Sequence, residues 1–320
     1  MKVAILSPGD MGAGIGGVLR KSGLDVLTCL DGRSNLTRLR ALESDIREVG
    51  FMDDVAREAD LVLSVLPPGE AIDIAERMAR SLRRTKSRLT YVDCNAVSPG
   101  TACNIEAIIR GGGSQFIDAG IICGPPRGPD SGTRFFCSGP DTSAFEALKD
   151  HGLDVRVVGP EIGQASGLKM VYAASTKGTT ALWTGLLATA RALGLQDALM
   201  RELESSRIAA QVMRGIPTMP RRSRRWVAEM EEIAATFAEA GLTPHLFEGA
   251  ADIYRLVGST ALGALTSRDA DPDLDTILEA MLRAASGPHP PSTSSGRGLA
   301  PSPLAERGKA DGGGLNDASS

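Results

Sequence analysis

A glycine-rich turn follows the first apolar segment of the chain. Residues 2–17 read KVAILSPGDMGAGIGG, and glycines spaced as G-x-G-x-x-G after a strand form the turn that binds the pyrophosphate of a dinucleotide. Two registers fit: 7-9-12, with Ser7 in the first position, and 12-14-17, with glycine throughout. The turn must open a helix, because the helix N-terminus supplies the N–H groups. The apolar segment 3–6 ends directly before Ser7, which favours the first register.

In this register the turn supplies six candidate cofactor-binding residues. Gly9 allows close approach of the backbone to the pyrophosphate, and Gly12 allows tight packing of helix on strand. Ser7 costs little if its backbone angles stay in the normal region, and its hydroxyl can then contact a phosphate. A structural turn without a ligand is the alternative interpretation. The six residues are Ser7, Pro8, Gly9, Asp10, Met11 and Gly12.

The segment CLDGRSNLTR, residues 29–38, follows the second expected strand and bears on the choice of cofactor. An acidic residue that binds the ribose 2′-hydroxyl favours NAD, whereas an arginine beside a hydroxyl favours the 2′-phosphate of NADP. Asp31 supports the first choice, and Arg33 with Ser34 supports the second. Because a guanidinium can bind phosphate through two N–H groups, we expect NADP, with NAD or a mere surface turn as alternatives.

The composition excludes several classes of protein. The chain has 320 residues, 42% hydrophobic and 23% charged, which is typical of a globular protein with room for two domains. A net charge of −4 provides no basic surface for nucleic acid or an anionic membrane, and 4% aromatic residues provide little surface for base stacking. The five cysteines form no C-x-x-C pair, so neither disulfides nor a metal site is expected. No signal peptide or membrane span is evident, so we expect a cytoplasmic protein.

Alternation of short apolar runs with helical segments up to about residue 160 predicts an α/β fold with a doubly wound parallel sheet. We expect a Rossmann domain over residues 1–162, an all-α domain over 163–286, and a disordered tail over 287–320, which is rich in Pro, Gly and Ser. Residues 166–194 read as one long helix that is apolar on nearly all sides. The expected strands are 3–6, 26–30, 61–66, 89–93, 115–117, 134–137 and 155–158, and the further helices are 196–213, 224–240, 246–257 and 272–285.

Five motifs in order resemble the β-hydroxyacid dehydrogenase superfamily, which includes 3-hydroxyisobutyrate and 6-phosphogluconate dehydrogenases. They are SPGDMG (7–12), VLSVLPP (62–68), VDCNAVSP (92–99), DAGIICGPP (118–126) and GQASGLKMVYA (163–173). Residues 224–254 resemble the second domain of a branch whose helical domain is short. The resemblance implies that Leu66, Pro67 and Pro68 line the nicotinamide side and that Asn95 lies near the nicotinamide ribose.

The same resemblance implies a substrate loop that this chain matches only in part. A serine commonly holds the substrate carboxylate there, and Ile122 stands in its place. The implied substrate-binding residues are Gly120, Ile121, Ile122 and Cys123. Recognition of the substrate must therefore differ from the family's.

The resemblance also implies that Lys169, six residues after Gly163, is the catalytic acid–base group. Burial in an apolar helix and a nearby nicotinamide cation would both lower its pKa. A lysine whose stem lies along an apolar helix is the alternative. The family's asparagine four residues later is Ala173 here, and Thr176 lies on the same face and can supply a hydroxyl. Lys177 is a second candidate base, about 80° away around a regular helix.

Two further features have an ordinary and a functional interpretation. The segment RRSRRW, residues 221–226, can bind a substrate carboxylate or phosphate, reach across a dimer, or simply be solvated beside the acidic residues of EMEEI. His245 either begins a helix or lines the substrate pocket.

We therefore expect an NAD(P)-dependent oxidoreductase that oxidises a small β-hydroxy acid, with Lys169 as acid–base group. Decarboxylation can follow if the product is a β-keto acid. A homodimer through the helical domain is expected, with no metal, nucleic acid or membrane partner. The alternatives are an imine reductase on the same scaffold, against which Lys169 argues, and an NADP-binding regulatory protein without turnover, which the missing serine and asparagine favour.

Overall fold

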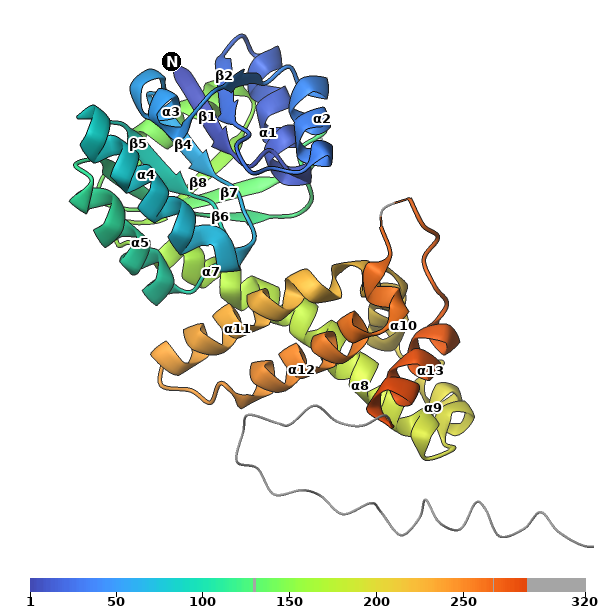
Figure 1. The fold of residues 1–320 in the computed structure, drawn as a ribbon. Helices are drawn as coiled ribbons and strands as arrows, with labels where there is room; N and C mark the ends of the chain where they lie inside the picture. Colours follow the sequence, from blue (N-terminus) through green and yellow to red (C-terminus); the bar gives the residue numbers. More distant parts are fainter. Residues whose placement is uncertain (129–130, 267, 287–320) are drawn as a thin grey trace, which may run out of the picture. The chain divides into compact units, whose positions relative to one another are not determined.

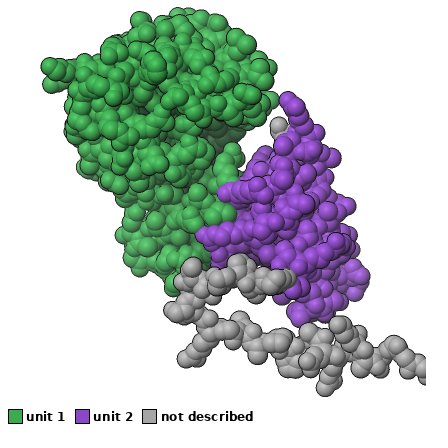
Figure 2. Space-filling view, viewed as in Figure 1, with its two compact units in different colours: residues 1–178, 225–251 green, residues 179–224, 252–320 purple. Residues whose placement is uncertain are grey.

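The computed structural model describes residues 1–128, 131–266 and 268–286, so the expected tail lies outside the described residues. These residues form two compact units (Figure 2). Unit 1 comprises residues 1–178 and 225–251, and unit 2 begins with residues 179–224 and resumes at residue 252. The expected boundary after residue 162 falls inside unit 1 and stays a prediction.

An eight-stranded sheet forms the centre of unit 1, in the order β3-β2-β1-β4-β5-β6-β7-β8. Strands β1 to β6 are parallel, which confirms the doubly wound α/β fold, whereas β7 pairs antiparallel with β6 and parallel with β8. The strands are β1 (Lys2–Leu6), β2 (Asp25–Cys29), β3 (Arg47–Val49), β4 (Leu61–Ser64), β5 (Thr90–Asp93), β6 (Gln115–Ile122), β7 (Arg134–Ser138) and β8 (Asp154–Gly159).

Helices cover both faces of this sheet because alternate residues of each strand point to opposite sides. In β1, Val3 and Ile5 belong to one buried apolar cluster and Ala4 and Leu6 to the other. The first cluster lies under α1 (Asp10–Lys21), α2 (Asn35–Glu43) and α6 (Ser143–Glu146). The second lies under α3 (Met52–Glu58), α4 (Ala71–Thr85) and α5 (Pro99–Gly111) (Figure 1).

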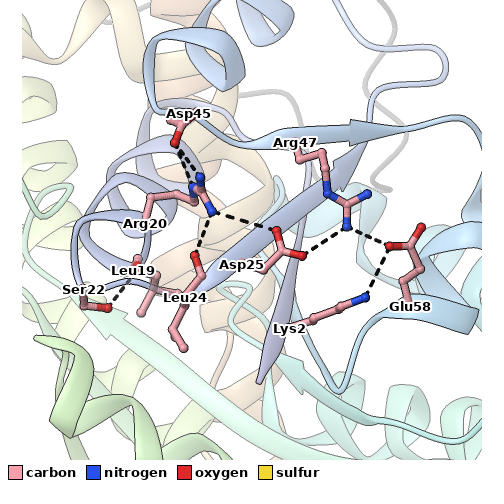
Figure 3. A network of polar contacts seen from close by, with 9 residues as sticks. All are labelled: Lys2, Leu19, Arg20, Ser22, Leu24, Asp25, Asp45, Arg47 and Glu58. Atoms are coloured by element: carbon pink, nitrogen blue, oxygen red, sulfur yellow. Dashed lines mark hydrogen bonds and ion pairs between the residues drawn. The ribbon is translucent and has the colours of Figure 1, made fainter.

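Ion pairs connect the amino-terminal ends of the first three strands (Figure 3). Arg47 donates to Glu58 at 2.7 Å and to Asp25 at 3.3 Å, and Lys2 lies 3.8 Å from Glu58. The hydrogen bond from Arg47 holds the pKa of Glu58 below its usual value. These contacts lie at the amino ends of the strands, opposite the carboxyl ends at which open α/β sheets bind their ligands.

The helix expected over residues 166–194 is interrupted, so that prediction was wrong in detail. Helix α7 (Gln164–Ala173) passes into a π-helical segment (Ala174–Gly178) and then into α8 (Thr179–Ala192). The segment is also not buried on all sides, since Val171 is 56% exposed and Leu182 is 59% exposed. Nothing in the residue pattern signals the wider i→i+5 hydrogen bonding of a π-helix.

The remaining helices follow the predicted ranges with one break. The expected helix 196–213 is two helices, α9 (Gln196–Leu203) and α10 (Arg207–Met213), with Ser206 capping the second by accepting from Ala209 N at 3.2 Å. In unit 2, α13 (Leu274–Ala285) packs on α8, where Arg191 donates to Glu279 at 2.7 Å. Helices α11 (Ser223–Glu239) and α12 (His245–Ser259) complete the fold. None of the helices in the described ranges has the length and apolarity that crossing a bilayer requires.

Candidate active site

The glycine-rich turn opens α1 directly after β1, as the register 7-9-12 requires. Gly9 is the N-cap residue of α1, and its N–H donates to Ser7 O at 2.7 Å. A side chain at Gly12 would lie 3.0 Å from Ile5 Cγ2 and 3.1 Å from Ser7 O, so helix and strand pack too closely for one. The expectation that the backbone angles of Ser7 stay in the normal region is wrong. Its φ is +60°, in the left-handed region where glycine is favoured.

The residues of this turn fit a dinucleotide. Gly9, the N-cap residue, has no side chain to cap the first N–H groups of α1. A Cβ at Gly9 would lie 4.0 Å from Ser7 O and, outside its chain neighbours, no closer to any other described residue, which leaves room for a ligand to approach. The strand order reverses between β1 and β4, which is where open α/β sheets bind their ligands. Pro8 is buried, Met11 packs against the core, and Asp10 lies 3.6 Å from Arg127.

A pocket at the end of β2 brings together Asp31 and Arg33, the two residues expected from the sequence to select the cofactor. Arg33 donates to Glu70 at 2.8 Å, and Asp31 lies 3.6 Å from Arg77 of α4. Ser34 instead caps α2 by accepting from Thr37 N at 3.2 Å. Sequence reasoning missed Arg77, because nothing local relates a residue of α4 to this pocket. The pocket is lined by Leu6, Ser7, Cys29, Asp31, Arg33, Met52, Ile74 and Arg77.

Asn95 holds the loop that follows β4. Its side chain is buried, its Oδ1 accepts from Leu66 N at 2.6 Å, and its Nδ2 donates to Ser64 Oγ at 3.0 Å and to Asp93. Pro67 is exposed and Pro68 is buried at the start of a 3₁₀ turn. The Asn95 side chain therefore fixes the backbone of the loop rather than facing solvent.

A buried carboxylate fixes the start of α7. Asp118 of β6 accepts from Gly163 N at 2.9 Å, Ser166 N at 3.0 Å, Ser166 Oγ at 2.5 Å and Ser138 Oγ at 3.0 Å. Burial raises the pKa of Asp118, and these hydrogen bonds oppose that shift. Gly163 has a φ of +97°, and a side chain there would lie 3.1 Å from Pro99 Cβ. Asp118 is the first residue of the motif DAGIICGPP, but the sequence did not predict that it anchors α7.

The anchored helix α7 packs closely on β6 at Lys169. A Cβ on Gly120 would lie 2.8 Å from Lys169 Cβ, so only glycine at this position lets the helix approach. The pKa of the Lys169 ammonium is lowered to about 8, chiefly by burial and also by the positive charge of Arg225, while Cys123 opposes the shift. The direction is the one expected from the sequence, and the amine becomes available as a base near neutral pH.

The expected substrate loop offers little polar surface. Gly120, Ile121 and Ile122 are buried, and Ile121 belongs to the core. Cys123 is exposed, has a φ of +83°, and accepts from Arg134 Nη2 at 3.3 Å. Ile122 provides no hydroxyl at this position.

Comparison with known proteins agrees with this geometry. The sequence profile of the NAD binding domain of 6-phosphogluconate dehydrogenase matches residues 2–152, and that of a domain of unknown function (DUF1932) matches residues 190–257. The uncharacterized 28.5 kDa protein in the 7S RNA 5′ region of Methanothermus fervidus is 30% identical over 186 residues, 58% of this chain and 70% of that protein. The chain belongs to the β-hydroxyacid dehydrogenase superfamily.

Solved structures of the superfamily share the fold. A conserved protein of unknown function, described as structurally similar to 3-hydroxyacid dehydrogenases, is 29% identical with a TM-score of 0.59, over 81% of this chain and 99% of that one. The Mycobacterium tuberculosis 3-hydroxyisobutyrate dehydrogenase, solved with L-serine, is 18% identical with a TM-score of 0.63, over 88% and 98%. The chain thus has the nicotinamide-dinucleotide-binding fold of a dehydrogenase or reductase.

Ala173 stands where the superfamily has an asparagine, and Thr176 is its proposed substitute. The two residues lie in different environments. Ala173 is buried and carries no polar group, and the regular helical period ends there. Thr176 lies in the π-helical segment, where its hydroxyl donates to Ala173 O at 3.2 Å. The face shared by Thr176 and Lys169 in a regular helix is therefore altered.

Lys177 and His245, the two other candidate site residues, each lie beside a carboxylate. Lys177 forms an ion pair with Glu229 and lies 5.5 Å from the centre of the Trp226 ring. The His245 side chain is 83% exposed, and its Nδ1 lies 2.7 Å from Glu248 Oε2. This is the environment of a residue that begins a helix.

Proposed function

We propose that the protein is an NADP-preferring dehydrogenase that oxidises the β-hydroxyl of a small hydroxy acid, with Lys169 as the acid–base group. The observation that carries the proposal is the position of Lys169, on a helix anchored at the carboxyl edge of the nucleotide-binding sheet. Its lowered pKa, about 8, suits proton transfer near neutral pH.

The chain's own residues supply the proton transfer and the positioning. A nicotinamide dinucleotide held by the turn over residues 7–12 would supply a hydride acceptor for the carbon that carries the substrate hydroxyl. Neutral Lys169 Nζ accepts the hydroxyl proton as the C–O bond becomes a carbonyl, and the ammonium returns it when the reaction runs in reverse. If the product is a β-keto acid, CO₂ can leave because the new carbonyl accepts the negative charge. Asp118 and Gly120 keep Lys169 in place.

The preference for NADP is supported by two arginines at the pocket beyond β2. Arg33 and Arg77 both line it, and the Asp31 carboxylate, which would bind a ribose hydroxyl, lies beside Arg77. A 2′-phosphate carries enough charge to replace Glu70 as the partner of Arg33.

Nucleotide affinity tests the cofactor. NADPH and NADH are titrated into the wild-type chain and into Arg33→Ala and Arg77→Ala, with fluorescence as the readout. We expect each substitution to weaken NADPH binding about tenfold or more, since one charged hydrogen bond contributes roughly 1.5–3 kcal/mol. NADH binding should change little. Equal losses for both nucleotides would instead indicate a structural role, and absence of any binding would refute the dehydrogenase.

Turnover tests the reaction against its two alternatives. Reduction of NADP is followed with 3-hydroxypropanoate, 3-hydroxybutanoate and 3-hydroxy-2-methylpropanoate, and oxidation of NADPH with a cyclic imine. The proposal expects activity with a hydroxy acid and its loss in Lys169→Met. Activity with the imine alone favours a reductase, and nucleotide binding without turnover of either class favours a regulatory protein.

The homodimer remains part of the proposal. Exposed apolar side chains such as Val171, Tyr172 and Leu182 lie along the long helical segment, where a second copy can cover them. Light scattering after size-exclusion chromatography measures the assembly.

A further inference from the structure

The first turns of α11 place a set of charges beside the helical segment that carries Lys169. The Glu229 side chain is only 8% exposed and forms an ion pair with Lys177. Arg225 Nε lies 3.9 Å from the other oxygen of Glu229, while the Arg225 side chain is 58% exposed. Glu229 therefore lies on one side of Arg225, while more than half of the Arg225 side chain faces solvent.

Helix α11 is also fixed to the nucleotide-binding sheet. Glu232 accepts from Ser98 N at 2.7 Å and from Thr101 Oγ1 at 3.0 Å, and Glu239 accepts from Ser98 Oγ and Gly100 N, both at 3.0 Å. These carboxylates stabilise the amino end of α5, where the helix dipole is positive. Pro99, in the same turn, packs against Gly163 at the start of α7. The helices bearing Lys169 and Arg225 thus share one anchor.

The charge of Arg225 reaches Lys169. After burial, the positive charge of Arg225 is the next cause that lowers the pKa of Lys169. The loop that should bind the substrate acid has buried Ile122 where the superfamily has a serine. The charge of Arg225 thus acts on the base, and the loop lacks the hydroxyl that commonly holds the substrate acid, so a positively charged group elsewhere can take over that role.

We propose that Arg225 binds the carboxylate of the substrate, in place of the serine that Ile122 replaces, and that Glu229 is its positioning residue. The inference rests on the proposed oxidation of a small hydroxy acid and names the group that recognises the acid. A guanidinium can bind a carboxylate through two N–H groups. Neutralising this charge in the complex makes protonation of Lys169 easier, which assists uptake of the hydroxyl proton.

The experiment compares Arg225→Gln with Arg222→Gln, a matched change in the same basic segment, and with Arg225→Lys. Each is assayed for NADP reduction with 3-hydroxypropanoate, 3-hydroxybutanoate and 3-hydroxy-2-methylpropanoate, and with their neutral amides. Affinity for NADPH is measured in parallel. In Arg225→Gln we expect KM for the acids to rise tenfold or more, with kcat within about threefold, while KM for the amides and the affinity for NADPH stay unchanged. Arg225→Lys should recover part of the loss, and Arg222→Gln should behave as wild type.

A second readout separates recognition from structural damage. Because removing a nearby positive charge makes the lysine easier to protonate, the pH dependence of kcat/KM with the amides should shift upward in Arg225→Gln. Acids turned over by wild type with an unchanged KM in Arg225→Gln would overturn this inference alone. So would parallel losses for acids, amides and NADPH. Failure of the wild-type chain to oxidise any of the acids would overturn the proposed function, and the inference with it.

Discussion

The environment of Lys169 determines how the rate should depend on pH. Its pKa is lowered to about 8, chiefly by burial. Because the neutral amine is the base, kcat/KM for oxidation should rise with pH and level off above about 8, while reduction should show the opposite trend. Replacement by Met should reduce the rate by about 10²–10⁴-fold. A profile for oxidation that falls across pH 7–9 would contradict the assignment of Lys169 as base.

The same burial carries a cost in folding free energy. The unfolded lysine titrates near 10.5 and the folded one near 8, so between these values the unfolded chain binds more protons and stability rises with pH. Below pH 8 the lysine is charged in both the folded and the unfolded chain, so the full free-energy cost of burying the ammonium remains. Lys169→Met should therefore be more stable than wild type at pH 7, by as much as about 3 kcal/mol, and this gain should shrink above pH 8. Urea unfolding at pH 7 and pH 10 measures it, and a variant less stable than wild type at pH 7 would show that the ammonium is well solvated.

Ser7 holds a conformation that glycine adopts without strain. With a φ of +60°, Ser7→Gly should stabilise the chain by up to about 1 kcal/mol and preserve NADPH affinity. Ser7→Ala keeps the strain and removes only the hydroxyl, so it is the matched control. If both variants lose affinity equally, the hydroxyl contacts the phosphate and the backbone strain is incidental. Thermal unfolding and fluorescence titration measure the two effects.

At the scale of elements, the approach of α7 to β6 depends on Gly120. A methyl group there would lie 2.8 Å from Lys169 Cβ and 3.0 Å from Ala165 O, so Gly120→Ala must displace the helix. We expect a loss of about 1–3 kcal/mol in stability and a larger fractional loss of kcat than of NADPH affinity. Gly111→Ala in α5, where a methyl group meets nothing within 4 Å, is the control for denaturant unfolding. Unchanged kcat in Gly120→Ala would mean that Lys169 does not depend on this packing.

Several elements followed from local pattern and others did not. The strand β3 was missed because only Val49 of its three residues is buried, which leaves no apolar run to detect. The π-helical segment was missed because its residues, ASTKG, suit an ordinary helix equally well. The strands with two buried faces were recognised, since each forms a continuous apolar run.

At the scale of the whole molecule, the cofactor turn and its pocket lie in unit 1, while the core of α13 lies in unit 2. NADPH at a hundred times its Kd should therefore add about 2.7 kcal/mol to the unfolding free energy of unit 1 and leave unit 2 unchanged. Differential scanning calorimetry measures both transitions. Ile277→Ala, at a fully buried position of α13, should destabilise unit 2 by about 2–5 kcal/mol and so identify its transition. An NADPH-induced shift confined to the transition that Ile277→Ala moves would contradict this location of the cofactor site.

The sequence by itself determined the alternation of strands and helices, the turn over residues 7–12 and the place of Lys169 six residues after Gly163. These features depend on neighbouring residues: apolar period, glycine conformation and the start of a helix. Tertiary structure alone decided that Arg77 reaches the pocket of Arg33, that Asp118 anchors α7, and that α11 returns to the nucleotide-binding unit. Such contacts join distant segments, as in the hydrogen bond from Ser98 to Glu239 across 141 positions. They form because the packing of whole helices brings these side chains together, and no local pattern records that packing.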